Sequence, residues 1–124
     1  MSARTALFIA SIALFLAVAA GAFGAHTLAK PLGQERIAVW QTAVQYQAWH
    51  GLAIFGVGLL MRDRPAGRGL AVAAWLFVAG IVLFSGSLYL LAATGARGFG
   101  IVTPVGGSAL LAGWATLAWA VMRR

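Results

Sequence analysis

The chain has 124 residues, of which 62% are hydrophobic and only 9% charged, whereas about a quarter of the residues of an ordinary soluble domain are charged. A soluble fold of this length leaves roughly a third of its chain surface exposed, and the sequence has too few polar residues to cover it. The net charge of +7 comes from basic residues scattered between apolar runs, which excludes a nucleic-acid-binding stripe. The absence of cysteine excludes disulfides and thiolate metal sites.

Long apolar runs separated by short charged segments dominate the chain from end to end. Each run exceeds the ~20 residues that a helix needs to cross about 30 Å of hydrocarbon. None of them alternates apolar and polar residues, as the strands of a membrane barrel would. We therefore predict one all-α membrane domain, residues 1–124, folded as a four-helix bundle with approximate spans 5–25, 43–61, 70–92 and 104–122.

The first run also resembles a secretory signal peptide, because Arg4 precedes an apolar core. The run continues beyond ~20 residues, however, and it carries small residues at helical spacing that let a neighbouring helix approach closely. We therefore expect it to be retained as the first span. The small residues expected at helix contacts are Ala13, Ala17, Gly21, Gly24, Ala25, Gly86, Gly106 and Gly107.

The segments between the runs predict how the chain turns and how it is oriented. Residues 34–48 mix polar and apolar side chains, which predicts a short interfacial helix before the second span. Pro65 marks the loop after that span, and Thr103 followed by Pro104 predicts a capped helix start. Basic residues favour the cytoplasmic side, so we predict both termini in the cytoplasm. The six basic residues at the termini and in the second loop, against three elsewhere, are Arg4, Arg62, Arg64, Arg68, Arg123 and Arg124.

Polar residues gather in the half of the predicted bundle that is remote from the termini. Tyr46 and His50 are four residues apart and share a helix face, as do Ser85 and Tyr89. For His50, a ligand or proton-carrying role and a neutral imidazole bonded across helices are both open. His26 lies nearer the surface, which favours a helix-end role. The candidate polar cluster comprises His26, Gln41, Tyr46, His50, Ser85, Ser87, Tyr89 and Thr103.

Catalytic chemistry is not predicted. Glu35 and Asp63 are the only carboxylates, and the predicted spans place them on opposite sides of the membrane, which excludes a carboxylate pair or a Ser-His-Asp triad. No phosphate-binding loop, dinucleotide fingerprint or zinc-protease motif occurs. Two histidines at similar depth permit a haem in principle, but axial histidines alone are a weak signal. We therefore expect no enzymatic activity, no cofactor and no metal site.

Four motifs and the pair that follows them carry a resemblance to a known family: residues 21–26, 41–50, 84–89, 103–107 and 113–114. In these motifs the chain resembles the domain-of-unknown-function 423 family, which includes inner-membrane proteins of the YgdD and YwdK type and is similar to eukaryotic transmembrane protein 256. The resemblance covers nearly the whole chain. It implies a multi-pass, four-helix protein of the bacterial cytoplasmic (inner) membrane, and it implies no mechanism.

Two functions remain open at this point. The first is a non-enzymatic structural or assembly protein of the lipid bilayer, for which a homo-oligomer and an unidentified membrane protein are both open as partners. The alternative is a binding or transport site for a small molecule, an ion or a proton in the polar half of the bundle. Nucleic acid is not expected as a partner.

Overall fold

The computed structural model describes residues 1–63 and 67–123, and all the regular elements of those residues are helical. The predicted loop residue Pro65 and the basic residues Arg64 and Arg124 lie outside the described residues. Two short segments are π-helical and one is a 3₁₀ helix. In chain order the elements are α1 (Ala3–Phe23), η1 (Gly24–Leu28, π), α2 (Ala29–Asp63), α3 (Arg68–Gly80), η2 (Ile81–Ser85, π), α4 (Gly86–Thr94), η3 (Arg97–Ile101, 3₁₀) and α5 (Thr103–Met122).

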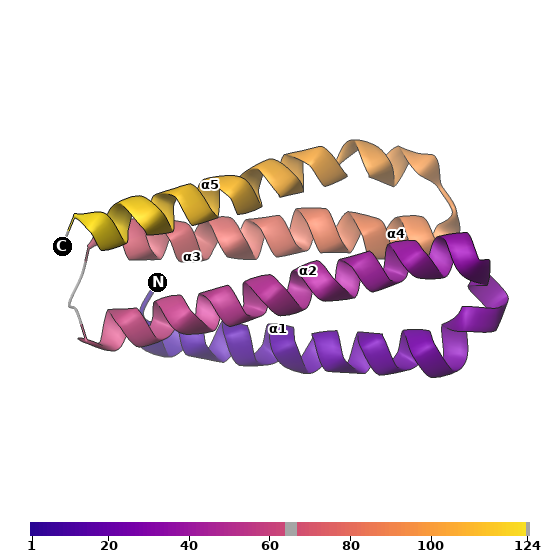
Figure 1. Ribbon diagram of the computed structural model, residues 1–124, viewed down its shortest axis with the longest axis horizontal. Helices are drawn as coiled ribbons and strands as arrows, with labels where there is room; N and C mark the ends of the chain where they lie inside the picture. The colour runs from indigo at the N-terminus through magenta and orange to yellow at the C-terminus, as the bar shows by residue number, and fades with distance from the viewer. Residues whose placement is uncertain (64–66, 124) are drawn as a thin grey trace.

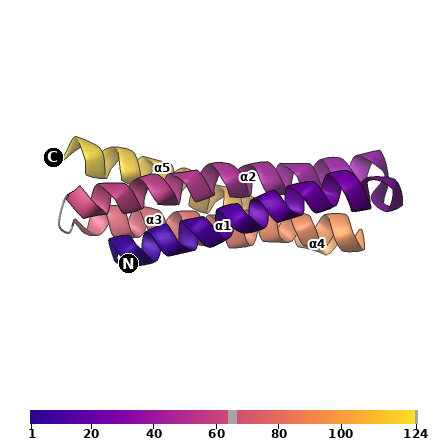
Figure 2. The same cartoon turned by 90° about the horizontal axis from the view of Figure 1, so that it is seen from below.

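The helices lie side by side along one axis (Figure 1). Helix α2 packs against α1 on one side and against α3, η2 and α4 on the other, and α5 packs on α3 and η2. The segments α3, η2 and α4 form one long continuous helix. Both termini lie at the same end of the molecule, which we call the terminal end (Figures 1 and 2). The opposite end, where the chain reverses near Gly33 and Gly95, is the turn end.

The prediction of a four-helix bundle is wrong. The described residues contain three helical stretches that are long and apolar enough to cross a membrane: Ala3–Asp63, Arg68–Thr94 and Arg97–Met122. The first stretch is bent at Gly33, where φ is 79° and ψ is 169°, so that its two arms, α1 and α2, lie antiparallel. The placement of both termini in the cytoplasm rested on the distribution of basic residues and stays a prediction; the structure places both termini at one end of the molecule (Figure 1).

The predicted interfacial helix before the second span is also wrong. Residues 34–48 are the first half of α2, which continues without a break to Asp63. The charged residues Glu35 and Arg36 do not end the helix, because long charged side chains keep their heads in a polar environment while the backbone stays hydrogen-bonded. Only a change of backbone dihedral angles, permitted at Gly33 by the lack of a Cβ, reverses the chain.

The helix ends are formed in different ways. The hydroxyl of Ser2 accepts a hydrogen bond from the backbone N–H of Thr5 at the start of α1, and Gly95 ends α4 in the left-handed conformation. The predicted cap at Thr103 is wrong, because Val102 is the N-cap of α5 and makes no side-chain cap bond. Pro104 lies in the first turn of α5, where its missing N–H leaves no hydrogen bond unmade.

The core is built mainly from small residues, which allow the helix backbones to approach closely. A Cβ on Gly113 would lie 2.8 Å from the ring of Phe77, and one on Gly106 would collide with the backbone of η2 at Phe84. The glycines on α5 therefore set its distance from α3 and η2. The buried residues of the central cluster are Ala6, Ala10, Ile54, Val57, Leu70, Ala73, Ala74, Phe77 and Leu110.

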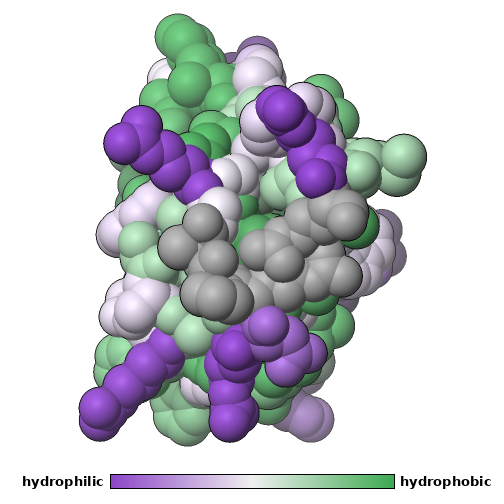
Figure 3. All heavy atoms as spheres, turned by 90° about the vertical axis from the view of Figure 1, so that its left-hand side faces the viewer, coloured by the Kyte–Doolittle hydropathy of each residue, from purple (hydrophilic) through white to green (hydrophobic). Residues whose placement is uncertain are grey.

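The outer surface between the two ends is apolar. Large side chains such as Phe15 on α1 and Leu111 on α5 are exposed for 70% and 73% of their surface, which is favourable in lipid and costly in water. Hydrophilic side chains gather instead around the terminal end (Figure 3), where Arg62 and Arg68 are exposed. This distribution is typical of a protein whose middle is surrounded by hydrocarbon and whose ends meet water.

Candidate functional site

His50 on α2 is buried and uses both of its ring nitrogens. Its Nε2 lies 3.0 Å from Nε1 of Trp114 on α5, and its Nδ1 lies 2.8 Å from the carbonyl oxygen of Tyr46. An indole N–H can only donate and a carbonyl can only accept, so Nε2 carries the lone pair and Nδ1 carries the proton. His50 is therefore a neutral imidazole with one defined tautomer, and neither nitrogen is left free for a ligand.

Aromatic rings enclose His50. The ring of Tyr46 is stacked with the imidazole at a centroid distance of 5.9 Å, and Phe77 approaches it at 5.7 Å. Phe77 in turn meets Trp114 edge to face at 5.0 Å, a favoured geometry for aromatic pairs. The imidazole thus joins α2, α3 and α5 through one aromatic cluster. Trp114 has no place in the predicted polar cluster, although the structure makes it the side-chain partner of His50.

A second set of hydrogen bonds joins α4, α2 and α1. The hydroxyl of Tyr89 donates to Oε1 of Gln47 at 2.7 Å, and Nε2 of Gln47 donates to the carbonyl oxygen of Ala13 at 2.8 Å. Close by, the Ser85 hydroxyl donates to the carbonyl oxygen of Ala43 at 2.8 Å. Gln47 is absent from the predicted cluster, although its place three residues before His50 puts it on a neighbouring part of the same helix surface.

Further polar contacts lie toward the turn end. The hydroxyls of Ser87 and Thr103 are 2.6 Å apart and join α4 to α5. The Nε of Arg36 donates to the carbonyl oxygen of Ala92 at 2.7 Å, and its Nη2 donates to that of Ala93 at 2.8 Å. Arg36 therefore caps the last carbonyls of α4, which have no helical partner. Within residues 1–63 and 67–123, no buried side-chain nitrogen or oxygen lacks a hydrogen-bond partner.

Two members of the predicted cluster stay apart from these bonds. His26 lies in η1 and is exposed, and Gln41 is exposed on α2. The structure therefore divides the predicted cluster into a histidine group, a glutamine–tyrosine group and a hydroxyl pair. In the part of the chain that the structure describes, no three His, Cys, Asp or Glu residues lie close enough together to hold a metal ion.

The predicted packing residues also fall into different environments. Ala17 is buried, and a Cβ on Gly21 would lie 3.4 Å from Val44, so these two small residues of α1 face α2. A Cβ on Gly24 would lie 2.7 Å from the ring of Trp40, and Gly106 is in close backbone contact with η2. Ala13 lines a cleft and also lies against α2, where a Cβ on Gly51 would be 3.6 Å from its own Cβ. The remaining members are Ala25, which is exposed; Gly107, in ordinary contact with Phe84; and Gly86, with open space beside it.

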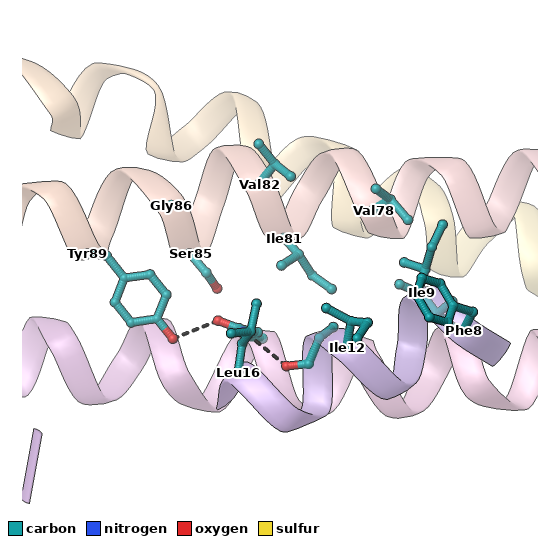
Figure 4. A pocket seen from close by; sticks show the side chains of 13 residues that line it. Phe8, Ile9, Ile12, Leu16, Val78, Ile81, Val82, Ser85, Gly86 and Tyr89 are labelled. Carbon is teal, nitrogen blue, oxygen red and sulfur yellow. Dashed lines mark hydrogen bonds between the residues drawn. The ribbon is translucent and has the colours of Figure 1, made fainter. Parts of the chain in front are cut away.

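An apolar cleft of about 420 Å³ separates α1 from the long helix formed by α3, η2 and α4 (Figure 4). The Gln47–Tyr89 hydrogen bond lies at the end of the cleft that is nearer to the turn end of the molecule. A second hollow of about 540 Å³ lies next to it toward the turn end and shares Leu16, Gln47 and Tyr89 with it. The cleft is lined by Phe8, Ile9, Ile12, Ala13, Leu16, Gln47, Ile54, Val78, Ile81, Val82, Ser85, Gly86 and Tyr89.

Membrane-length helices, an apolar exterior and internally bonded polar groups define a small multi-pass integral membrane protein. Residues 20–107 match the family described as "Protein of unknown function (DUF423)", and the chain belongs to this family. It is 43% identical to the UPF0382 inner membrane protein YgdD of Escherichia coli K12, over 94% of this chain and 88% of the relative. It is 42% identical to the UPF0382 membrane protein YwdK of Bacillus subtilis 168, over 94% and 95%.

These similarities confirm the predicted family and the location in the bacterial inner membrane. A third relative, the UPF0382 membrane protein SH2409 of Staphylococcus haemolyticus, is 39% identical over 90% of this chain and 89% of its own length. No solved structure shows a significant match to the chain.

Proposed function

We propose that this membrane protein has a structural, non-enzymatic role, in which its buried polar side chains hold the helices together. The observation that supports this proposal is the engagement of both ring nitrogens of His50, by Trp114 and by the Tyr46 carbonyl. A histidine that carries protons or binds a ligand needs a nitrogen free to exchange its partner. His50 would have to break its bond to Trp114 first.

The positions of the carboxylates support the same proposal. Glu35 lies near the turn end of α2, and Asp63 ends the same helix at the terminal end. Neither is near His50, which lies between them on α2, so no carboxylate orients or activates the imidazole. The alternative of an ion or proton site is therefore less well supported than a structural role.

A double-mutant cycle tests the structural role of the His50–Trp114 bond. Trp114→Phe keeps an aromatic ring and removes the N–H donor, while His50→Leu removes the acceptor. If the bond holds α2 to α5, the two changes share a coupling energy of about 0.6 kcal/mol and at most ~1.7 kcal/mol, the range found for hydrogen bonds between membrane helices. Reversible unfolding in mixed micelles measures this energy for the single variants and the double variant.

The same variants test the absence of proton transport. Protein reconstituted into liposomes with an internal pH-sensitive dye should give the same proton flux as empty liposomes, and His50→Leu should not change it. A flux above that of empty liposomes that disappears in His50→Leu would contradict the proposal. A coupling energy of zero with unchanged stability in both single variants would also contradict it.

A further inference from the structure

The cleft between α1 and the α3–η2–α4 helix lies at the depth of the hydrocarbon. Its lining on α1 runs from Phe8 to Leu16, the middle of a helix that extends from residue 3 to residue 23. On the opposite wall it runs from Val78 to Tyr89, well inside the stretch 68–94. Water is unfavourable at this depth. We propose that the cleft binds one acyl chain of a membrane phospholipid.

The shape of the cleft fits a thin, flexible chain. Small residues from the two walls, Ala13 and Gly86, line it, and a Cβ built on Gly86 meets no atom within 4 Å. Bulky side chains stand along its edges, including Phe8, Ile12 and Val82, which are exposed for 66%, 45% and 64% of their surface. In the close-up view, Ile12 of α1 and Ile81 of the opposite helix point toward one another across the gap, whereas Val82 points away from α1 (Figure 4).

A transmembrane helix fits this cleft less well than an acyl chain does. Helices approach each other in membranes through small residues, whereas Phe8, Ile12 and Val82 at the edges would hold a helix away from the cleft. On the other side of the long helix, Gly80 already packs against Leu110 of α5, and Gly106 of α5 packs against the backbone of η2. A flexible chain can follow the space between bulky side chains and make van der Waals contact with both walls.

The polar atoms in the cleft walls also favour an apolar occupant. The hydroxyl of Ser85 is bonded to the Ala43 carbonyl, and the hydroxyl of Tyr89 is bonded to Gln47. An acyl chain therefore breaks none of these hydrogen bonds when it enters. Part of the wall, Ile81 to Ser85, is the π-helical segment η2, a distortion that often accompanies functional sites in helices. This inference goes beyond the structural role and does not depend on it.

Native mass spectrometry of the protein, after stepwise removal of lipid with detergent, tests the inference. The probe is phosphatidylethanolamine of defined chain length added to the delipidated protein. We expect one bound phospholipid per wild-type chain. Gly86→Leu places a side chain in the cleft and should lower the retained fraction by about tenfold, a change well above the error of a binding measurement. Gly56→Leu is the matched control, because Gly56 is exposed on α2, has open space beside it and lies outside the cleft.

A second pair of variants keeps the test decisive if Gly86→Leu fails to fold, as judged by circular dichroism. Ile12→Trp enlarges a side chain that points into the cleft (Figure 4) and should also release the lipid, whereas Leu111→Trp on the exposed face of α5 should not. Absence of bound phospholipid in the wild type, or equal retention in wild type and folded cleft variants, would overturn the inference. A wild-type dimer that the cleft variants abolish would assign the cleft to a second copy of the chain instead.

Discussion

The long helix formed by α3, η2 and α4 has two sides that differ in how they use glycine. On the side of α5, a Cβ on Gly80 or Gly106 would collide with Leu110 or with the η2 backbone, and one on Gly113 would lie 2.8 Å from Phe77. On the side of α1, a Cβ on Gly86 would meet nothing within 4 Å. Glycine therefore brings two helices into contact on one side and leaves a cleft open on the other.

This difference shows that a small residue in a membrane helix does not by itself identify a helix contact. Small residues allow close approach, but the neighbouring helix must be there to use the space. The backbone of η2 fills the space beside Gly106 of α5, whereas α1 is held against α2 and leaves the space beside Gly86 empty. Variants that act on one side only can separate the two uses.

The largest effect is expected from truncating Phe77, whose side chain packs between the long helix and α5. Phe77 is fully buried against Gly113 and Trp114, so Phe77→Ala should lower the free energy of unfolding by about 3 kcal/mol through lost packing. Phe8→Ala, at the exposed edge of the cleft, should change it by less than about 0.5 kcal/mol. Unfolding in mixed micelles measures both values. Equal losses would mean that the two sides are packed alike.

A smaller effect is expected at the bond that links the cleft walls through Gln47. Tyr89→Phe removes the hydroxyl that donates to Gln47 and keeps the ring, which packs edge to face on Trp40 at 4.7 Å. We expect a loss of about 0.6 kcal/mol and at most ~1.7 kcal/mol in the unfolding free energy. The control is Ser108→Ala, since the exposed Ser108 hydroxyl bonds only to the carbonyl of Pro104 in its own helix. If Ser108→Ala lowered the unfolding free energy as much as Tyr89→Phe, the hydrogen bond between Tyr89 and Gln47 would contribute no more than a bond within one helix.

The smallest effect is expected at the turn end of the same helix. Arg36→Gln removes the charged donors that cap the carbonyls of Ala92 and Ala93 and should cost about 0.3–1 kcal/mol. Because the loss is local, amide hydrogen exchange should rise in the last turn of α4 while exchange in α5 stays the same. Arg97→Gln, an exposed residue at the start of η3, is the control. Unchanged exchange in α4 would contradict a capping role for Arg36.

Properties that depend on composition could be predicted from the sequence. The apolar runs indicated a membrane protein, and the motifs indicated its family, both of which the relatives confirm. The helix count could not be obtained in this way, because the reversal between α1 and α2 depends on the dihedral angles of Gly33 alone. The predicted spans left residues 26–42 between them, a segment that includes Gly33, but the sequence did not show that helix continues on both sides of this one glycine.

In the site, only the contacts between residues close together in the sequence could be predicted. The spacing of Tyr46 and His50 placed them on one helix face, and the structure joins the imidazole to the Tyr46 carbonyl. The bond to Trp114 connects residues 64 positions apart, and no periodicity relates them. Gly86 and Gly106 look alike in the sequence, as glycines within two residues of a serine. Their environments differ only because the helices that face them differ.

The most direct test of this two-sided use of glycine is one substitution made on each side. Gly106→Ala should destabilise the protein by about 1–3 kcal/mol, because the added methyl group meets the backbone of η2. Gly86→Ala should leave stability unchanged or raise it by about 0.5–1 kcal/mol, because alanine is the better helix former and φ is already −59°. Thermal unfolding of both variants in one detergent measures the difference. Equal destabilisation by the two alanines would contradict the account.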